Sequence, residues 1–135
     1  MHHFGSINFL AVLVAALSGF VVGALWYGPL FSKAWMVASG MTKEKGAKSN
    51  PAVLFGTAFV LNLIAATGLA SLISGHGGWH FGLHEGLAAG LFFVATAIGV
   101  IFLFEMRPLK LFLIDAGYML VNFGVMGTIL GAWPN

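Results

Sequence analysis

Four long runs of apolar residues follow one another along the chain, and shorter segments between them hold most of its charges. The runs cover approximately residues 7–27, 52–74, 80–104 and 109–132. Each run reaches the roughly 20 residues that a helix needs to cross a hydrocarbon core of about 30 Å. Backbone groups in lipid must be paired within the protein, so the runs predict helices rather than open strands. We therefore expect residues 1–135 to form a single all-α integral membrane domain, a bundle of four transmembrane helices.

The segment after the first run has an amphipathic pattern of its own. Pro29 is expected to end the first span. Beyond it, Phe31, Trp35 and Ala38 fall on one helical face, which predicts a short interfacial helix after the first span. Residues 40–50 are hydrophilic and predict a cytoplasmic loop.

The composition argues against a soluble globular domain, a protein with disulfides or thiol chemistry, and a nucleic-acid-binding protein. Hydrophobic residues make up 59% of the chain and charged residues only 7%, whereas ordinary globular domains have about 25% charged residues. With no cysteine, the chain holds no disulfide, thiol nucleophile or thiolate metal site. It also lacks a phosphate-binding loop and a basic, aromatic surface, so a nucleic-acid partner is not expected.

The basic residues indicate an orientation in the membrane. All six lie in the first and third links: Lys33, Lys43, Lys45, Lys48, Arg107 and Lys110. Because links rich in Lys and Arg stay in the cytoplasm, both termini are predicted on the outer side.

Two segments carry a family resemblance. The sequence "WYGPLFSKAWM" follows the first span, and "RPLKLFLIDAGYMLVNFGVMGTILGAW" ends the chain. Together they resemble the bacterial membrane family known as domain of unknown function 1761. The resemblance implies a small four-helix protein of the bacterial inner (cytoplasmic) membrane, and it implies no substrate and no catalytic residue.

Small residues recur at intervals of four within the spans. They include Gly19 and Gly23 in the first span, Gly82, Gly86 and Gly90 in the third, and Gly127 and Gly131 in the fourth. Small residues at this spacing let helices in lipid approach closely. One interpretation is packing within a four-helix bundle. The other, which the number of stripes favours, is assembly into a homo-oligomer.

Four polar side chains fall within the predicted spans: Asn62, Asp115, Tyr118 and Asn122. The last three share one helical face, and Asn62 lies at a depth similar to that of Asn122. Ionisable groups inside a membrane are costly and often functional, which suggests a proton or cation relay that starts at Asp115. The alternative is a structural clasp, with the asparagines bonded to each other and Asp115 paired with a basic residue: Lys33, Arg107 or Lys110.

Histidines gather where the third span begins. His80 and His84 lie at positions i and i+4, a spacing that allows two imidazoles to hold zinc or another transition metal. Glu85 or His76 would complete such a site. A pH-sensitive rim, or an ordinary polar boundary at the outer end of the span, fits the same residues.

These features favour a non-enzymatic membrane subunit without a cofactor. No set of catalytic residues and no charge at the middle of the membrane accompany the spans. The expected partners are membrane lipid and either further copies of the chain or a larger membrane complex. A small oligomeric channel or transporter is the alternative, and a histidine metal-binding protein is a second one.

Overall fold

The computed structural model describes residues 7–73 and 77–133, and this part of the chain is helical with no strand. Four of its helical segments are long and apolar enough to cross a membrane: Phe9–Leu30, Pro51–Ile73, Gly78–Phe104 and Leu109–Ala132. The prediction of an all-α, multi-pass membrane fold is therefore confirmed.

Two of the four spans are assembled from more than one helical element. The first consists of α1 (Phe9–Leu25) and the π-helix η2 (Trp26–Leu30). The third consists of α5 (Gly78–Ala89), the π-helix η3 (Gly90–Ala95) and α6 (Thr96–Phe104). The second and fourth are the single helices α4 (Pro51–Ile73) and α7 (Leu109–Ala132). Between the first two spans lie the short helices α2 (Ser32–Ser39) and α3 (Lys43–Ala47).

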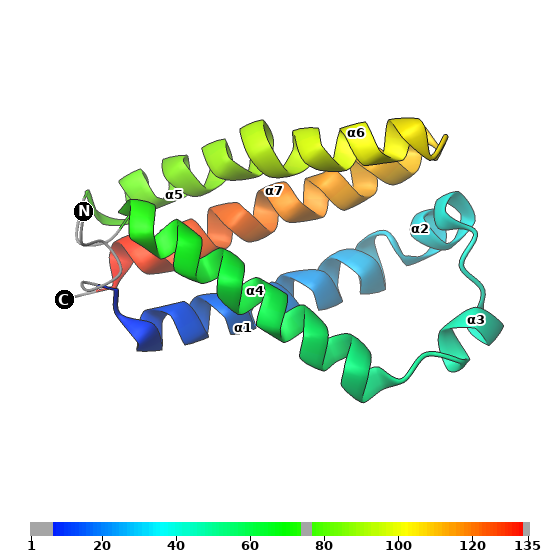
Figure 1. Ribbon diagram of the computed structural model, residues 1–135, viewed down its shortest axis with the longest axis horizontal. Coiled ribbons are helices and arrows are strands. Elements are labelled where there is room, and N and C mark those ends of the chain that lie inside the picture. The colour runs from blue at the N-terminus through cyan, green and yellow to red at the C-terminus, as the bar shows by residue number, and fades with distance from the viewer. Residues whose placement is uncertain (1–6, 74–76, 134–135) are drawn as a thin grey trace.

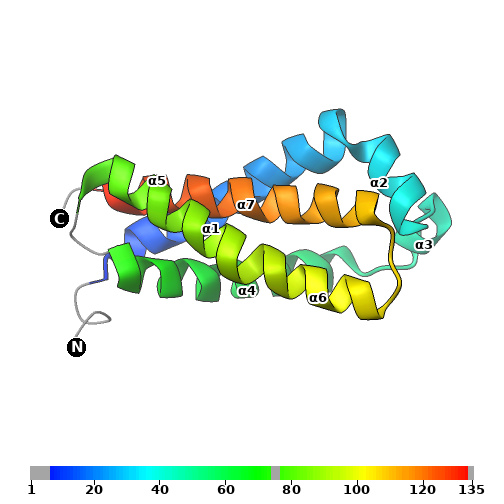
Figure 2. The same cartoon turned by 90° about the horizontal axis from the view of Figure 1, so that it is seen from above.

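The two ends of the bundle differ in character (Figures 1 and 2). Helices α2 and α3 lie at one end together with the turn between α6 and α7. We call this the link end, and it carries the six basic residues of the first and third links. At the opposite end, which we call the core end, α1 and α5 begin and α4 and α7 finish.

The first span continues past Pro29, where the sequence predicted its end. Residues 26–30 form a π-helical turn in which the Phe31 N–H donates to the Trp26 carbonyl at 2.9 Å. A π-turn is wider than an α-turn, and such turns are frequent at functional sites. The wider turn accommodates the proline and carries the helix on to Leu30.

Helices α5 and α7 form the most extensive helix pair, and glycines line their contact. A Cβ atom added to Gly82 would clash with the Gly127 carbonyl oxygen, and one added to Gly86 would clash with the Phe123 carbonyl oxygen. An added Cβ on Gly131 would similarly clash with the Gly78 carbonyl. The two backbones lie so close that only glycine fits at these positions.

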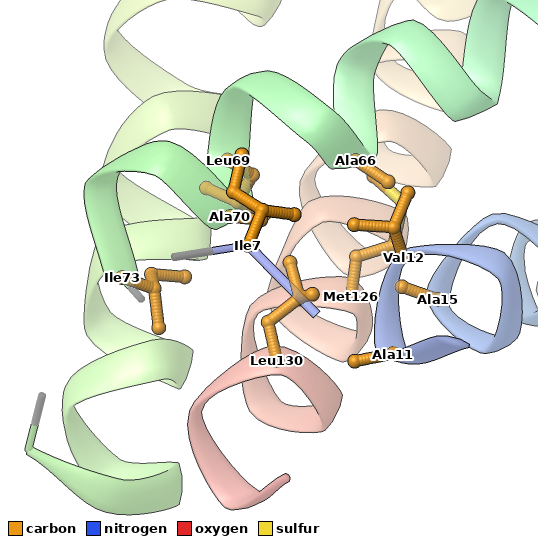
Figure 3. Close-up of a cluster of buried hydrophobic side chains, with 10 residues drawn as sticks. All are labelled: Ile7, Ala11, Val12, Ala15, Ala66, Leu69, Ala70, Ile73, Met126 and Leu130. Atoms are coloured by element: carbon orange, nitrogen blue, oxygen red, sulfur yellow. The ribbon is translucent and has the colours of Figure 1, made fainter. Parts of the chain in front are cut away.

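The buried apolar core fills the core end between α1, α4 and α7 (Figure 3). Its members are Ile7, Ala11, Val12, Ala15, Ala66, Leu69, Ala70, Ile73, Met126 and Leu130. Ala15, Ala66, Ile73 and Met126 have no exposed surface. Small alanines on α1 and α4 let these helices approach, while Ile73 and Met126 fill the remaining space. This half of the bundle is therefore densely packed.

We expect Gly86→Ala to destabilise the protein by about 1–3 kcal/mol, because its methyl group would force α5 away from α7. Gly56→Ala is the matched control, since a Cβ there meets no atom within 4 Å. That change should be neutral or stabilise the helix by up to about 1 kcal/mol. Thermal melting in detergent, followed by circular dichroism, measures both. Equal melting temperatures for the two variants would contradict the close approach.

Candidate functional site

Asp115, near the start of α7, is hydrogen-bonded to a tyrosine of the first span. The Tyr27 hydroxyl donates to Asp115 Oδ1 at 2.7 Å. Among the described residues, the one ion pair joins Arg107 Nε to Glu105 Oε1 at 3.9 Å, so none of the described basic side chains pairs with Asp115. The predicted pairing of Asp115 with Lys33, Arg107 or Lys110 is therefore wrong, and its partner is Tyr27.

Tyr118 lies one helical turn further along α7, toward the core end. Its hydroxyl donates to the Gly19 carbonyl of α1 at 3.0 Å. Gly23 lies against the same side chain, and a Cβ there would be 3.4 Å from its hydroxyl, an ordinary van der Waals contact. The Tyr118 and Tyr27 rings also meet edge to face, with centroids 5.3 Å apart. Tyr118 therefore contacts Tyr27 at one end and α1 near the middle of the bundle at the other.

Asn122 and Asn62 meet between α7 and α4, another turn toward the core end. The Asn122 Nδ2 donates to Asn62 Oδ1 at 3.3 Å, and Asn62 Nδ2 donates to the Ala16 carbonyl of α1 at 2.8 Å. Asn122 is completely buried. Its Oδ1 has no hydrogen-bond donor within the described part of the chain. We call Asp115, Tyr118, Asn122 and Asn62, with their partner Tyr27, the polar ladder.

Gly19 creates the space in which the two asparagines meet. A Cβ at this position would clash with Asn62 Nδ2 and lie 3.0 Å from Asn122 Oδ1. Gly19 and Gly23 therefore face polar side chains of α4 and α7, whereas Gly82, Gly86 and Gly131 face the backbone of another helix.

Trp26 fixes the end of the first span against α7. Its indole N–H donates to the Ile114 carbonyl at 2.9 Å. The ring lies against Gly117, where an added Cβ would be 3.0 Å from Trp26 Cζ2. Consecutive residues of η2, Trp26 and Tyr27, thus both hydrogen-bond to α7. Together they hold this end of the first span beside Asp115.

A cavity of about 500 Å³ opens beside Asp115 at the link end. It is lined by Tyr27, Ser32, Trp35, Met36, Ile98, Phe102, Asp115, Tyr118 and Met119. The wall is mostly apolar and aromatic, and Asp115 is its one acidic side chain. Helix α2, predicted to lie at the membrane interface, covers the cavity with Ser32, Trp35 and Met36. We call this the aspartate cavity.

A second hollow, of about 300 Å³, lies between α4 and η3. Its lining is Gly19, Phe20, Ala58, Leu61, Asn62, Ala65, Val94, Tyr118, Met119 and Phe123. Tyr118 and Met119 line both hollows, so the two adjoin along α7. We call the second one the lateral groove. Toward the core end, the fully buried Met126 follows Asn122 on α7, and the apolar core begins there.

The histidine positions lie at the core end, away from both hollows. His80 and His84 are exposed on α5, opposite its buried glycines. His84 Nδ1 lies 2.8 Å from the His80 carbonyl, and the His80 ring stacks on Trp79 with centroids 3.6 Å apart. His76 is outside the described residues, within which no group of three His, Asp or Glu side chains is placed to hold a metal. A site with His76 as a ligand remains a prediction.

Sequence reasoning missed several polar or aromatic members of the site, and three of them are close together in the sequence. Tyr27, Ser32 and Trp35 come from the first span and the link that follows it, whereas Asp115 comes from the fourth span. Tyr27 and Asp115 are 88 residues apart, so periodicity within one helix does not relate them. The available signal was the placement of all three within "WYGPLFSKAWM", one of the two segments that carry the family resemblance.

Residues 10–131 match the family described as "Protein of unknown function (DUF1761)". The chain belongs to this family. The match includes every member of the polar ladder and both hollows, and no curated protein or solved structure matches this family member.

A double-mutant cycle tests the asparagine pair in this family member. We expect Asn62→Ala and Asn122→Ala each to lower the free energy of unfolding, with a coupling energy between them of about 0.6 and at most about 1.7 kcal/mol, the range found for bonds between membrane helices. Thr67→Ala paired with Asn122→Ala is the control, because the Thr67 hydroxyl donates to Leu63 within its own helix. A coupling energy equal to that of the control would mean that the 3.3 Å contact adds no stability.

Proposed function

We propose that this protein is a non-enzymatic membrane subunit that assembles with a second copy of itself, and that the lateral groove is the contact surface. The observation that carries the proposal is the open side of the bundle between α4 and η3. The polar ladder fits a role without catalysis, because its groups bond to one another and to backbone carbonyls, as a structural clasp requires.

The open side follows from the way α4 crosses the bundle. Helix α4 packs on α1, α5 and α7, and no extensive contact joins it to η3 or α6 in the described chain. In Figure 1 its beginning lies far from α6. Only 11% of the most apolar window of α4 is buried, the same share as in the span Gly78–Phe104, compared with 39% for α7. One side of a single copy is therefore left without a helical neighbour.

The lining of the groove suits a helix better than a lipid chain. Ala58 and Ala65 are small, so a second helix has room to approach closely. Asn62 and Tyr118 add polar groups, and polar side chains within a membrane usually face protein. An isologous dimer would place one copy's α4 against the other's. Leu61, on the rim and 61% exposed, would then be covered.

The glycine stripes do not contribute to this proposal. Gly19 and Gly23 are used by the polar ladder, and Gly82, Gly86, Gly127 and Gly131 are used by the α5–α7 contact. Each stripe thus has a partner within the chain. The support for assembly comes from the groove.

A small channel or transporter is the second candidate, and the adjoining hollows favour it. They place Asp115, Tyr118 and Asn62 along one route from the link end to the middle of the bundle. A complete route would require either movement of the apolar core or an axis between subunits. Ion flux into liposomes that contain the purified protein tests this candidate, and absence of flux above protein-free liposomes would argue against it.

The test of assembly is native mass spectrometry of the full chain released from its membrane. We expect the wild type at twice its monomer mass. Ala58→Phe should shift it toward the monomer, because the larger ring occupies the groove. Ala97→Phe is the matched control, since Ala97 is an exposed alanine on α6 outside the lining of the groove. A monomeric wild type that retains lipid would mean that lipid covers the groove, and equal dissociation by both variants would assign the interface elsewhere.

A further inference from the structure

The aspartate cavity has the chemistry of a binding site for an organic cation. We propose that it binds an organic ammonium group attached to an apolar body, with Asp115 as the counter-charge and aromatic rings as the wall. The aspartate cavity adjoins the lateral groove at Tyr118 and Met119, but Asp115, Tyr27 and Trp35 lie outside the lining of the groove, so either proposal can fail without the other.

The first step is the charge of the cavity. Asp115 supplies the one acidic side chain of the lining, and the lining contains no basic residue. Arg107, the basic residue of the neighbouring turn, is engaged with Glu105 and lies with its Cζ 5.1 Å from the centroid of the Phe102 ring. Tyr27 gives Asp115 a hydrogen bond without neutralising its charge. A cation is therefore the ligand that complements this wall.

The second step is the arrangement of aromatic rings around the carboxylate. Tyr27, Trp35, Phe102 and Tyr118 all line the cavity. Tyr27 meets Trp35 edge to face with centroids 5.7 Å apart, and it meets Tyr118 at 5.3 Å. Tyr27 therefore stands at an angle to two other aromatic rings of the same lining. Such aromatic cages attract ammonium groups through cation–π interactions, which strengthen when the site excludes water.

The third step separates an organic cation from a metal ion. Hard metal ions such as Ca²⁺ and Mg²⁺ need several oxygen ligands around one point. The cavity supplies one carboxylate, one serine hydroxyl and two tyrosine hydroxyls, and the two tyrosine hydroxyls are held by different partners, Asp115 and the Gly19 carbonyl, rather than gathered around one point. The remaining wall is apolar, and the volume of about 500 Å³ leaves room for a ligand with an apolar body.

The test uses the full chain in nanodiscs made only of phosphatidylglycerol, whose headgroup has no ammonium group. Benzyltrimethylammonium is the probe, and neopentylbenzene is its uncharged isostere. Calorimetric titration against empty nanodiscs should detect the cation and show at least about tenfold weaker binding of the isostere, since about 1.4 kcal/mol corresponds to a factor of ten. Isostere binding within about threefold of the cation would overturn the proposal.

Variants assign the site. Asp115→Asn should weaken binding of the cation by at least about tenfold, because the amide keeps the shape and an acceptor for Tyr27 but loses the charge. Glu44→Gln, which removes an exposed carboxylate of α3 outside the cavity, should leave it unchanged. Trp35→Leu should weaken binding about tenfold and Trp35→Phe much less, which gives a second test if Asp115→Asn does not fold. Equal losses in Asp115→Asn and Glu44→Gln would refute a site at Asp115.

A final comparison identifies the source of the ammonium group. In nanodiscs that contain phosphatidylethanolamine, selective retention of that lipid by the wild type and not by Asp115→Asn would identify a lipid headgroup as the ligand. Undiminished binding of the soluble probe in the same nanodiscs would identify a free amine. Both results support an ammonium site, and failure of both the probe and the lipid to bind would overturn it.

Discussion

Hydrogen bonds along one face of α7 hold the first and second spans in register. Asp115, Tyr118 and Asn122 reach Tyr27, the Gly19 carbonyl and Asn62 respectively. Apolar contacts between membrane helices are not strongly directional, because lipid tails are as apolar as the side chains that they replace. The polar ladder makes the packing directional, because each of its hydrogen bonds forms in only one register of α1 and α4 against α7. The aspartate cavity and the lateral groove lie on either side of Tyr118, so their positions follow from the same register.

The opposite face of α7 is held by a different kind of contact. There Gly127 and Gly131 lie against α5 with almost no side chain between the backbones. Close approach on this face and polar bonds on the other make α7 the centre of the bundle, and it also has the most deeply buried apolar window of the four spans. Over its first half, helix α4 has neither a close glycine contact nor a polar bond to α7. There it diverges from the bundle and begins to form one wall of the groove.

Much of the fold could be predicted from the sequence, because it depends on the lengths of apolar runs. The four spans and the helix after the first follow from those lengths and from the pattern of Phe31, Trp35 and Ala38. The end of the first span could not be predicted correctly, since Pro29 usually stops an α-helix and the sequence does not indicate that a π-turn absorbs it. For the site, one-helix periodicity grouped Asp115, Tyr118 and Asn122, and similar depth related Asn62 to Asn122. Tyr27 and Trp35 belong to the site only because η2 and α2 fold back beside α7, which is a property of the tertiary structure.

The central place of α7 also has a consequence for the order in which the protein is made. Ribosomes synthesise the three other spans before α7, so the first and third spans enter the membrane without the helix on which they pack most, whereas α4 already has its main partner, α1. Asn62 already has the Ala16 carbonyl as a partner at that stage. The Gly19 carbonyl and the glycine face of α5 gain their partners only when the fourth span is in place. The nascent bundle is therefore held mainly by the pairing of α1 with α4, and the third span gains its main partner only when the fourth helix arrives.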